Sequence, residues 1–246
     1  MFDDLILVGW LDGLSAGAIM FSALIFGVLS ITKGVKNRQR LLIIAGIEVL
    51  AIGSYYSAPF VDFLWYGFMD THIELWLYPL IAYTQVPVGV VFLAVLGGEL
   101  IMPNYKQAVM GMYGALGMML FVFIYTGVYA QAYEVGAPYS PPFSGFYYTI
   151  PTPAGELIDV SFAPWSPTVM LIWVFQFTNL IFMGGGFMIK AIQASGSLRR
   201  KFFLISLAFI IFFGTGIIDS FWGGVPKTVG RTIMISFGPL IYIGFR

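Results

Sequence analysis

Three acidic side chains stand inside long apolar stretches: Asp12, Glu48 and Asp219. A carboxylate among apolar residues is costly unless it faces protein or water, so each one marks a candidate site for protons, ions or a ligand. Asp12 follows Trp10, and both Asp219 and Tyr125 are expected near the same end of their helices as Asp12. We expect Tyr125, Asp12, Trp10 and Asp219 to converge on one site near the outer membrane face. The alternative is that Asp12 lies close enough to the surface to be solvated.

Amide side chains continue this polar series toward the middle of the apolar stretches. Gln85, Gln176 and Asn179 are expected at mid-membrane depth, and Glu48 lies closer to the opposite end. A chain of such groups can pass protons across a membrane, because each member accepts or donates a hydrogen bond. The alternative is that the amides only bond between helices, and that Glu48 reaches the surface or pairs with Arg40.

The composition places these residues in a membrane protein. The chain has 246 residues, of which 59% are hydrophobic and 10% charged, and its mean hydropathy is +0.88. Such a chain is too apolar for a water-soluble domain, so its surroundings are membrane lipid and no nucleic acid partner is expected. It has no cysteine for an iron–sulfur cluster and one histidine, which cannot supply both axial ligands of a haem. Any such cofactor would belong to a partner.

Apolar stretches long enough to cross a membrane define the fold. A hydrocarbon core of roughly 30 Å needs about 20 helical residues. The sequence predicts an all-α integral membrane protein with about seven transmembrane helices, the last of them short. The predicted segments are 5–31, 41–60, 75–102, 108–130, 167–192, 202–222 and 231–245.

The basic residues predict how these helices are oriented. One set of connections contains ten of the twelve cations, and the other set contains only Lys227 and Arg231 together with most of the acids. Because basic residues accumulate on the cytoplasmic side, we expect the N-terminus outside and the C-terminus inside a cytoplasmic or plasma membrane. The ten cations are Lys33, Lys36, Arg38, Arg40, Lys106, Lys190, Arg199, Arg200, Lys201 and Arg246.

Two connections interrupt the helical pattern. Residues 131–166 predict a long outer loop with two short strands, and they divide the chain into a four-helix half, 1–130, and a three-helix half, 167–246. A loop of this length usually binds or docks something. The aromatic and acidic residues 60–74 predict a connection at the membrane surface.

The third segment contains two prolines, Pro79 and Pro87. Proline removes a backbone donor, so the pair predicts a kink whose freed carbonyl groups are bonded by other helices or polar side chains.

Two motifs resemble a known family. Residues 13–18 read Gly-Leu-Ser-Ala-Gly-Ala and are followed by Ser-Ala-Leu at 22–24, and residues 125–128 read Tyr-Thr-Gly-Val. Both resemble the corresponding helices of the NrfD-type membrane subunits of polysulfide reductase and related molybdopterin enzymes. Residues 175–186 are weakly similar in the same order.

The resemblance implies a heme-free site for quinone or quinol near the outer membrane face. It also implies an iron–sulfur electron-transfer subunit and a catalytic subunit docked there. The family tyrosine that hydrogen-bonds the quinone falls on Tyr125, and Glu48 stands where a family acidic residue is expected. The family histidine of the first helix falls near Val8, so that ligand is absent. Seven predicted crossings instead of eight are a further departure.

The function expected from the sequence is therefore that of a membrane anchor exchanging electrons between quinone and an iron–sulfur partner, with proton transfer as an additional role. Two alternatives remain. The helix ends and the outer loop are also compatible with a seven-helix sensor or receptor for a small ligand. Asp12, Glu48 and Asp219 are compatible with a proton-coupled carrier, which would work without a redox partner.

Overall fold

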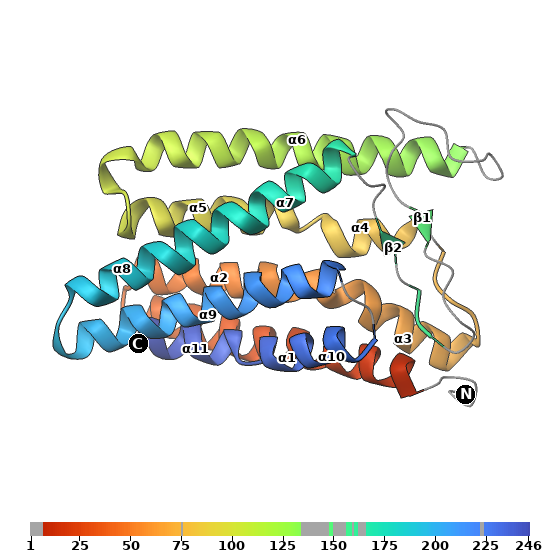
Figure 1. Ribbon diagram of the computed structural model, residues 1–246, viewed down its shortest axis with the longest axis horizontal. Helices are drawn as coiled ribbons and strands as arrows, with labels where there is room; N and C mark the ends of the chain where they lie inside the picture. Colours follow the sequence, from red (N-terminus) through yellow and green to blue (C-terminus); the bar gives the residue numbers. More distant parts are fainter. Residues whose placement is uncertain are drawn as a thin grey trace.

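The computed structural model shows a bundle of long helices, with α1 starting at one end and α11 finishing near the other (Figure 1). It describes residues 7–74, 76–133, 148–149, 156–158, 160–161, 166–221 and 224–246. Within these residues, seven helical spans are long and apolar enough to cross a membrane. The chain is thus a multi-pass membrane protein, as its composition predicts.

Several of the seven spans are built from more than one helix. The first four spans are α1 (Leu7–Lys36); α2 (Arg40–Gly53), the 3-10 turn η1 (Ser54–Tyr56) and α3 (Ser57–Met69); α4 (Leu77–Tyr83) and α5 (Val86–Leu100); and the 3-10 turn η2 (Pro103–Tyr105) with α6 (Lys106–Tyr133). The last three are α7 (Pro167–Asn179), the π-helix η3 (Leu180–Gly185) and α8 (Gly186–Gln193); α9 (Gly196–Phe221); and α10 (Gly224–Met234) with α11 (Phe237–Phe245).

Most of the predicted outer loop, 131–166, lies outside the described residues. Within it, β1 (Tyr148–Thr149) pairs antiparallel with β2 (Val160–Ser161), in the segment where the sequence predicts two short strands.

Two predicted boundaries are wrong. The segment 60–74 is not only a surface connection, because α3 continues the second span to Met69 and ends at Asp70 in a left-handed conformation with φ 59°. The last span is not confined to 231–245, because α10 begins at Gly224 and the span runs from Pro226 to Phe245. In both places polar residues suggested a loop, whereas the structure gives them partners inside the bundle.

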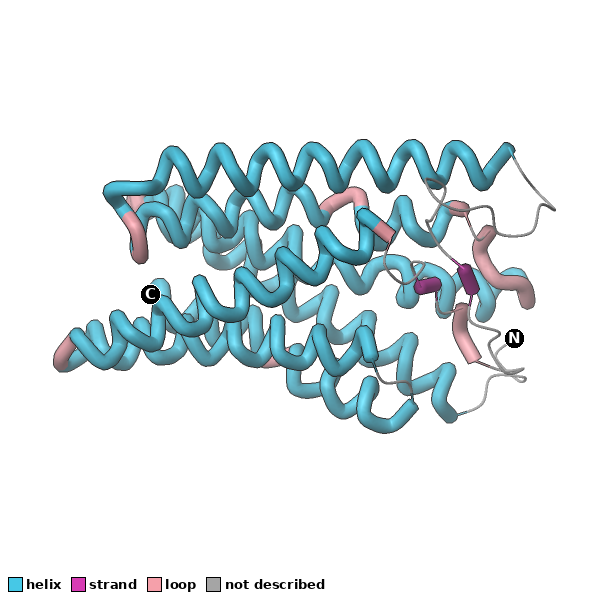
Figure 2. Tube along the Cα trace, turned by 45° about the horizontal axis from the view of Figure 1, so that its top comes forward, coloured by secondary structure: helices cyan, strands magenta, loops and turns pink. Residues whose placement is uncertain are grey.

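The spans form a closed ring in which each one contacts the next. Helix α1 packs on α2 and α3, α2 on α5, α5 on α6, and α6 on α7. The segment from α7 to α8 then packs on α9, and α10 and α11 pack on both α9 and α1. The tube in Figure 2 shows the same arrangement from a second direction. The last span therefore packs against the first one, α1. The predicted division into a four-helix half and a three-helix half stays a prediction.

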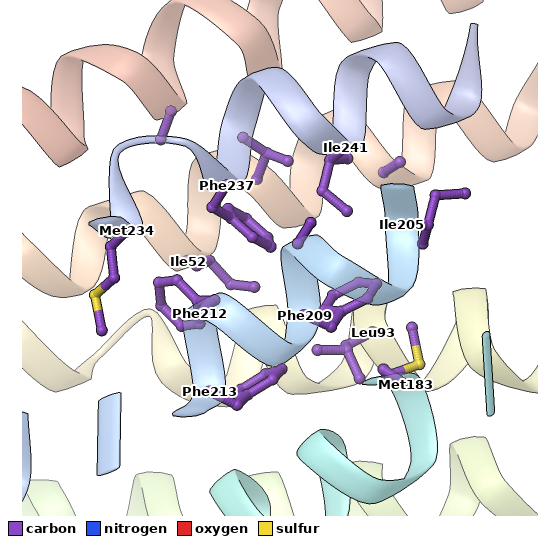
Figure 3. Close-up of a cluster of buried hydrophobic side chains, with 14 of the residues drawn as sticks. Ile52, Leu93, Met183, Ile205, Phe209, Phe212, Phe213, Met234, Phe237 and Ile241 are labelled. Atoms are coloured by element: carbon purple, nitrogen blue, oxygen red, sulfur yellow. The ribbon is translucent and has the colours of Figure 1, made fainter. Parts of the chain in front are cut away.

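The centre of the ring is filled by aromatic and aliphatic side chains. Figure 3 shows Phe209, Phe212 and Phe213 of α9 beside Phe237 of α11. The rings of Phe212 and Phe237 are 5.0 Å apart, a spacing at which tilted aromatic pairs attract. Side chains from α2, α5, η3 and α11 surround them, namely Ile52, Leu93, Met183 and Ile241.

Small residues let α1 approach its neighbour closely. A Cβ atom added at Gly13 would lie 2.3 Å from the Phe63 ring, and one added at Gly17 would lie 2.6 Å from the Phe60 ring. Two turns of α1 therefore accept aromatic rings from α3 in the space that side chains would occupy. This is the packing that small residues provide between membrane helices, where burial from water supplies no driving force.

Candidate functional site

Four charged side chains meet where α1, α9 and α10 come together, and three of them are buried while Asp219 is partly buried. Lys227 Nζ lies 2.9 Å from Asp12 Oδ2, and Arg231 lies between Asp12 and Asp219. The Arg231 Nε donates to Asp219 Oδ1 at 2.8 Å, and its NH1 is 3.4 Å from Asp12 Oδ1. Two carboxylates and two cations thus balance one another inside the bundle. We call Asp12, Asp219, Lys227 and Arg231 the charge cluster.

The spacing along α10 positions both cations. Lys227 and Arg231 are four residues apart and therefore share one face of the helix. The guanidinium carbon of Arg231 lies 5.3 Å from the centre of the Tyr56 ring, and the Tyr56 hydroxyl donates to Met234 Sδ at 2.8 Å. Arg231 is therefore bounded by carboxylates and by an aromatic face, which attracts a cation electrostatically.

The predicted place of these two cations is wrong. Lys227 and Arg231 are expected in an outer connection, but both lie in α10 and are buried. The alternative that Asp12 is solvated is also wrong, because Asp12 is buried and paired with Lys227. The signal that could have found them is their spacing of four residues, combined with the two carboxylates that need partners.

The charge cluster can fix the positions of three helices, because each carboxylate comes from a different helix and both meet α10. Removing one charge from such a cluster leaves another one buried without compensation. Asp12 and Asp219 are already engaged with cations, so they are poor candidates for passing protons in this conformation.

Tyr125 lies apart from the charge cluster. It is 42% exposed on α6, and its ring stacks on the partly exposed Phe121 at 4.4 Å. Figure 1 places α6 on the opposite side of the bundle from α1 and α10. Trp10 lies nearer to Asp12 along α1 and packs edge-on against Phe63, with ring centres 5.4 Å apart. The expected site is thus divided: Asp12 and Asp219 share Arg231, whereas Tyr125 does not join them.

Glu48 is fully buried in α2, and neither of its carboxylate oxygens has a hydrogen-bond partner among the described residues. The alternative for Glu48 is wrong in both forms, because its side chain does not reach the surface and Arg40 lies 3.3 Å from Glu99 instead. An ionised carboxylate without a partner is costly in such surroundings, which therefore favour an uncharged side chain.

Two buried amide oxygens resemble the Glu48 oxygens in their hydrogen bonding. Asn179 Oδ1, at the end of α7, and Gln176 Oε1, about one turn earlier in the same helix, have no hydrogen-bond partner within the described part of the chain. Glu48, Gln176 and Asn179 thus leave several polar atoms available inside the bundle. Polar atoms of this kind are the ones that hold internal water or a polar ligand.

Gln85, the fourth residue of the predicted proton series, has a structural role. Its amide nitrogen donates to the backbone oxygens of Ser54, Ile81 and Ala82. These carbonyls lie at the break between α4 and α5 and at the turn η1 of the neighbouring span. The break that the two prolines predict is confirmed, and polar groups from the neighbouring span help to satisfy it: Ser57 Oγ donates to Ile81 O at 3.0 Å.

A third buried carboxylate among the described residues, Asp62 of α3, was not identified from the sequence. It accepts hydrogen bonds from the backbone N–H groups of Ile73 at 3.0 Å and Ile158 at 3.1 Å, and it contacts His72 Nδ1 at 3.0 Å. The His72 ring also packs against Tyr66, with centres 4.7 Å apart. One carboxylate thus fastens the α3–α4 connection and residues 156–158 to the same end of α3. Sequence patterns do not reveal this, because both amide donors are backbone groups.

Among the residues that the structure describes, no three histidine, aspartate or glutamate side chains gather where they could hold a metal ion. No protein-family model, curated protein or solved structure matches the chain.

Proposed function

We propose that this protein is a heme-free membrane subunit of a respiratory oxidoreductase. In this proposal it lies in a cytoplasmic or plasma membrane with its N-terminus outside, and it exchanges electrons between quinone and an iron–sulfur subunit docked on the outer face beside a catalytic subunit. The support comes from the motifs at 13–18 and 125–128, which resemble NrfD-type subunits, and from the multi-pass helical bundle in which they lie. The seven spans of the described residues, instead of the family's eight, remain a departure.

The observation that carries the quinone site is the exposed aromatic pair of Phe121 and Tyr125. A quinone dissolves in the membrane and reaches a protein from its side, where this pair is exposed on α6. The Tyr125 hydroxyl can donate a hydrogen bond to a quinone carbonyl, and the Phe121 ring offers a surface for stacking. Since Asp12 and Asp219 are held in the charge cluster, we assign them to positioning helices and not to contact with quinone.

The test is purification in mild detergent, followed by identification of accompanying chains and measurement of bound iron and quinone. We expect Tyr125→Phe, which removes only the hydroxyl, to lower bound quinone and quinone-linked turnover by about tenfold, the effect of one lost hydrogen bond. Tyr105→Phe is the matched control, because Tyr105 is exposed in η2 at the other end of α6. A chain that purifies alone and without quinone would contradict the proposal and favour the receptor alternative.

Proton transfer through Glu48 is a second candidate role. It is favoured by a carboxyl group that is fully buried and has no hydrogen-bond partner in the described part of the chain. Glu48→Gln keeps the shape and removes the proton-carrying group. We expect it to abolish proton uptake by proteoliposomes, measured with a pH-sensitive dye, while Glu99→Gln preserves uptake. Proton uptake that persists in Glu48→Gln would assign Glu48 a packing role. Proton uptake that is driven by a solute gradient, in proteoliposomes that contain no redox partner protein, would instead indicate a proton-coupled carrier.

A further inference from the structure

A groove opens at the turn between α8 and α9, with a volume of about 430 Å³. Its walls come from the last turns of α8 and the first turns of α9. Gly196 makes the sharp change of direction possible, since its φ of +61° is one that other residues adopt at a cost. The turn therefore sets two antiparallel helix ends side by side and leaves a hollow between them.

One part of the groove is strongly basic. Arg199 and Arg200 line it, both are exposed, and neither makes an ion pair with any residue that the structure describes. The same end of the bundle holds the α1–α2 and α5–α6 turns and the end of α11, with their own basic residues (Figure 1). The one described acid in these turns, Glu99, is engaged with Arg40. The potential at this groove is thus positive, and it favours an anion.

The other part of the groove is apolar. Met188 and Ala191 of α8 face Phe203 of α9, and Ile192 exposes 72% of its surface beside them. Met188 belongs to the fifth span, and Arg199, Arg200 and Phe203 belong to the sixth, in which the two arginines lie close to the end that begins at Gly196. The groove therefore leads from a cationic mouth into an apolar wall that continues along the spans.

We propose that this groove binds an anionic phospholipid. Arg199 and Arg200 hold the phosphate of the headgroup, which guanidinium groups recognise by charge-assisted hydrogen bonds. One acyl chain lies along Met188, Ile192 and Phe203, which a free phosphate ion would leave uncovered. This charge and polarity pattern matches a phospholipid and does not depend on the redox function proposed above.

Native mass spectrometry of the purified full chain tests the site, with phosphatidylglycerol and phosphatidylcholine of identical acyl chains as probes. We expect phosphatidylglycerol to be retained preferentially, and the double variant Arg199→Gln/Arg200→Gln to reduce its retention at least about tenfold. Lys36→Gln/Arg38→Asn is the control, because it removes two charges from the same end of the bundle but outside the groove. Equal retention of both lipids, or an equal loss in the control, would overturn the proposal.

Two further measurements separate the lipid from a free anion and from misfolding. Phe203→Ser should weaken retention of phosphatidylglycerol, and an excess of inorganic phosphate should not displace the lipid from the unaltered chain. Complete displacement by phosphate would overturn the lipid assignment. Melting temperatures in lipid-free detergent should be the same for all variants. If a variant of the two arginines melts earlier, Arg199→Lys/Arg200→Lys is measured in its place, because it keeps both charges. This variant must retain phosphatidylglycerol if charge holds the lipid.

Discussion

At the scale of single residues, the stability of the fold depends on the balance of positive and negative charges in the charge cluster more than on any one ion pair. Lys227→Met leaves Asp12 with one cation fewer, and we expect it to destabilise the protein by on the order of 3 kcal/mol. Adding Asp12→Asn should recover much of this loss, because the cluster then again holds equal numbers of positive and negative charges. A double-mutant cycle of detergent-based unfolding measures the coupling. Strictly additive effects would show that Lys227 and Asp12 do not stabilise the fold as a pair.

Asp62 gives a prediction for the hydrogen bonds at the end of α3. Asp62→Asn replaces one accepting oxygen by a donor, so the amides of Ile73 and Ile158 cannot both remain bonded. Hydrogen bonds to a charged group contribute about 1.5–3 kcal/mol, so exchange of at least one amide should accelerate tenfold or more. Hydrogen–deuterium exchange measures this. Asp70→Asn, an exposed carboxylate on the same connection, should change neither amide.

At the scale of helices, glycines in α1 and α6 should respond in opposite directions to the same substitution. Gly13→Ala pushes a methyl group into the Phe63 ring and should cost about 1–3 kcal/mol. Gly111→Ala, in α6, meets no atom within 4 Å and should stabilise the helix by up to about 1 kcal/mol. Thermal unfolding of the two variants in one detergent compares them. A Gly13→Ala variant that melts like the unaltered chain would contradict the close packing of α1 on α3.

The sequence predicts helices better than it predicts their ends and partners. Apolar length identifies all seven spans, and the proline pair identifies the break before α5. The extension of α3 through Asp62 was missed, because a carboxylate bonded by distant backbone groups looks the same in a sequence as a solvated one. Lys227 and Arg231 were missed for the same reason: their partners, Asp12 and Asp219, lie in other helices. Residues whose environment is made by tertiary contacts are the ones that local patterns place wrongly.

At the scale of the whole molecule, the seven spans found among the described residues predict that the first and the last of them leave the membrane on opposite faces. With ten of twelve cations at one end of the bundle, we expect the C-terminus in the cytoplasm. A C-terminal epitope tag should resist protease added outside intact cells and become accessible once they are permeabilised, whereas an N-terminal tag should be cleaved at once. Cleavage of both tags from outside would contradict the orientation and, with it, the placement of the quinone site on the outer face.

The charge cluster also has a consequence for how the protein is made. The ribosome synthesises α1 long before α10, so Asp12 reaches the bilayer before Lys227 and Arg231 exist, whereas Asp219 in α9 precedes both cations by only a few residues. The seventh span has the lowest mean hydropathy of the seven, 1.3, and it contains both Lys227 and Arg231. A cation inside the bilayer opposes insertion by as much as about 2.5–3.5 kcal/mol. We therefore expect insertion of this span to depend on ion pairs with Asp12 and Asp219 of the same chain. A chain whose translation stops early keeps uncompensated charge, a defect through which chaperones and proteases can distinguish it from the finished product.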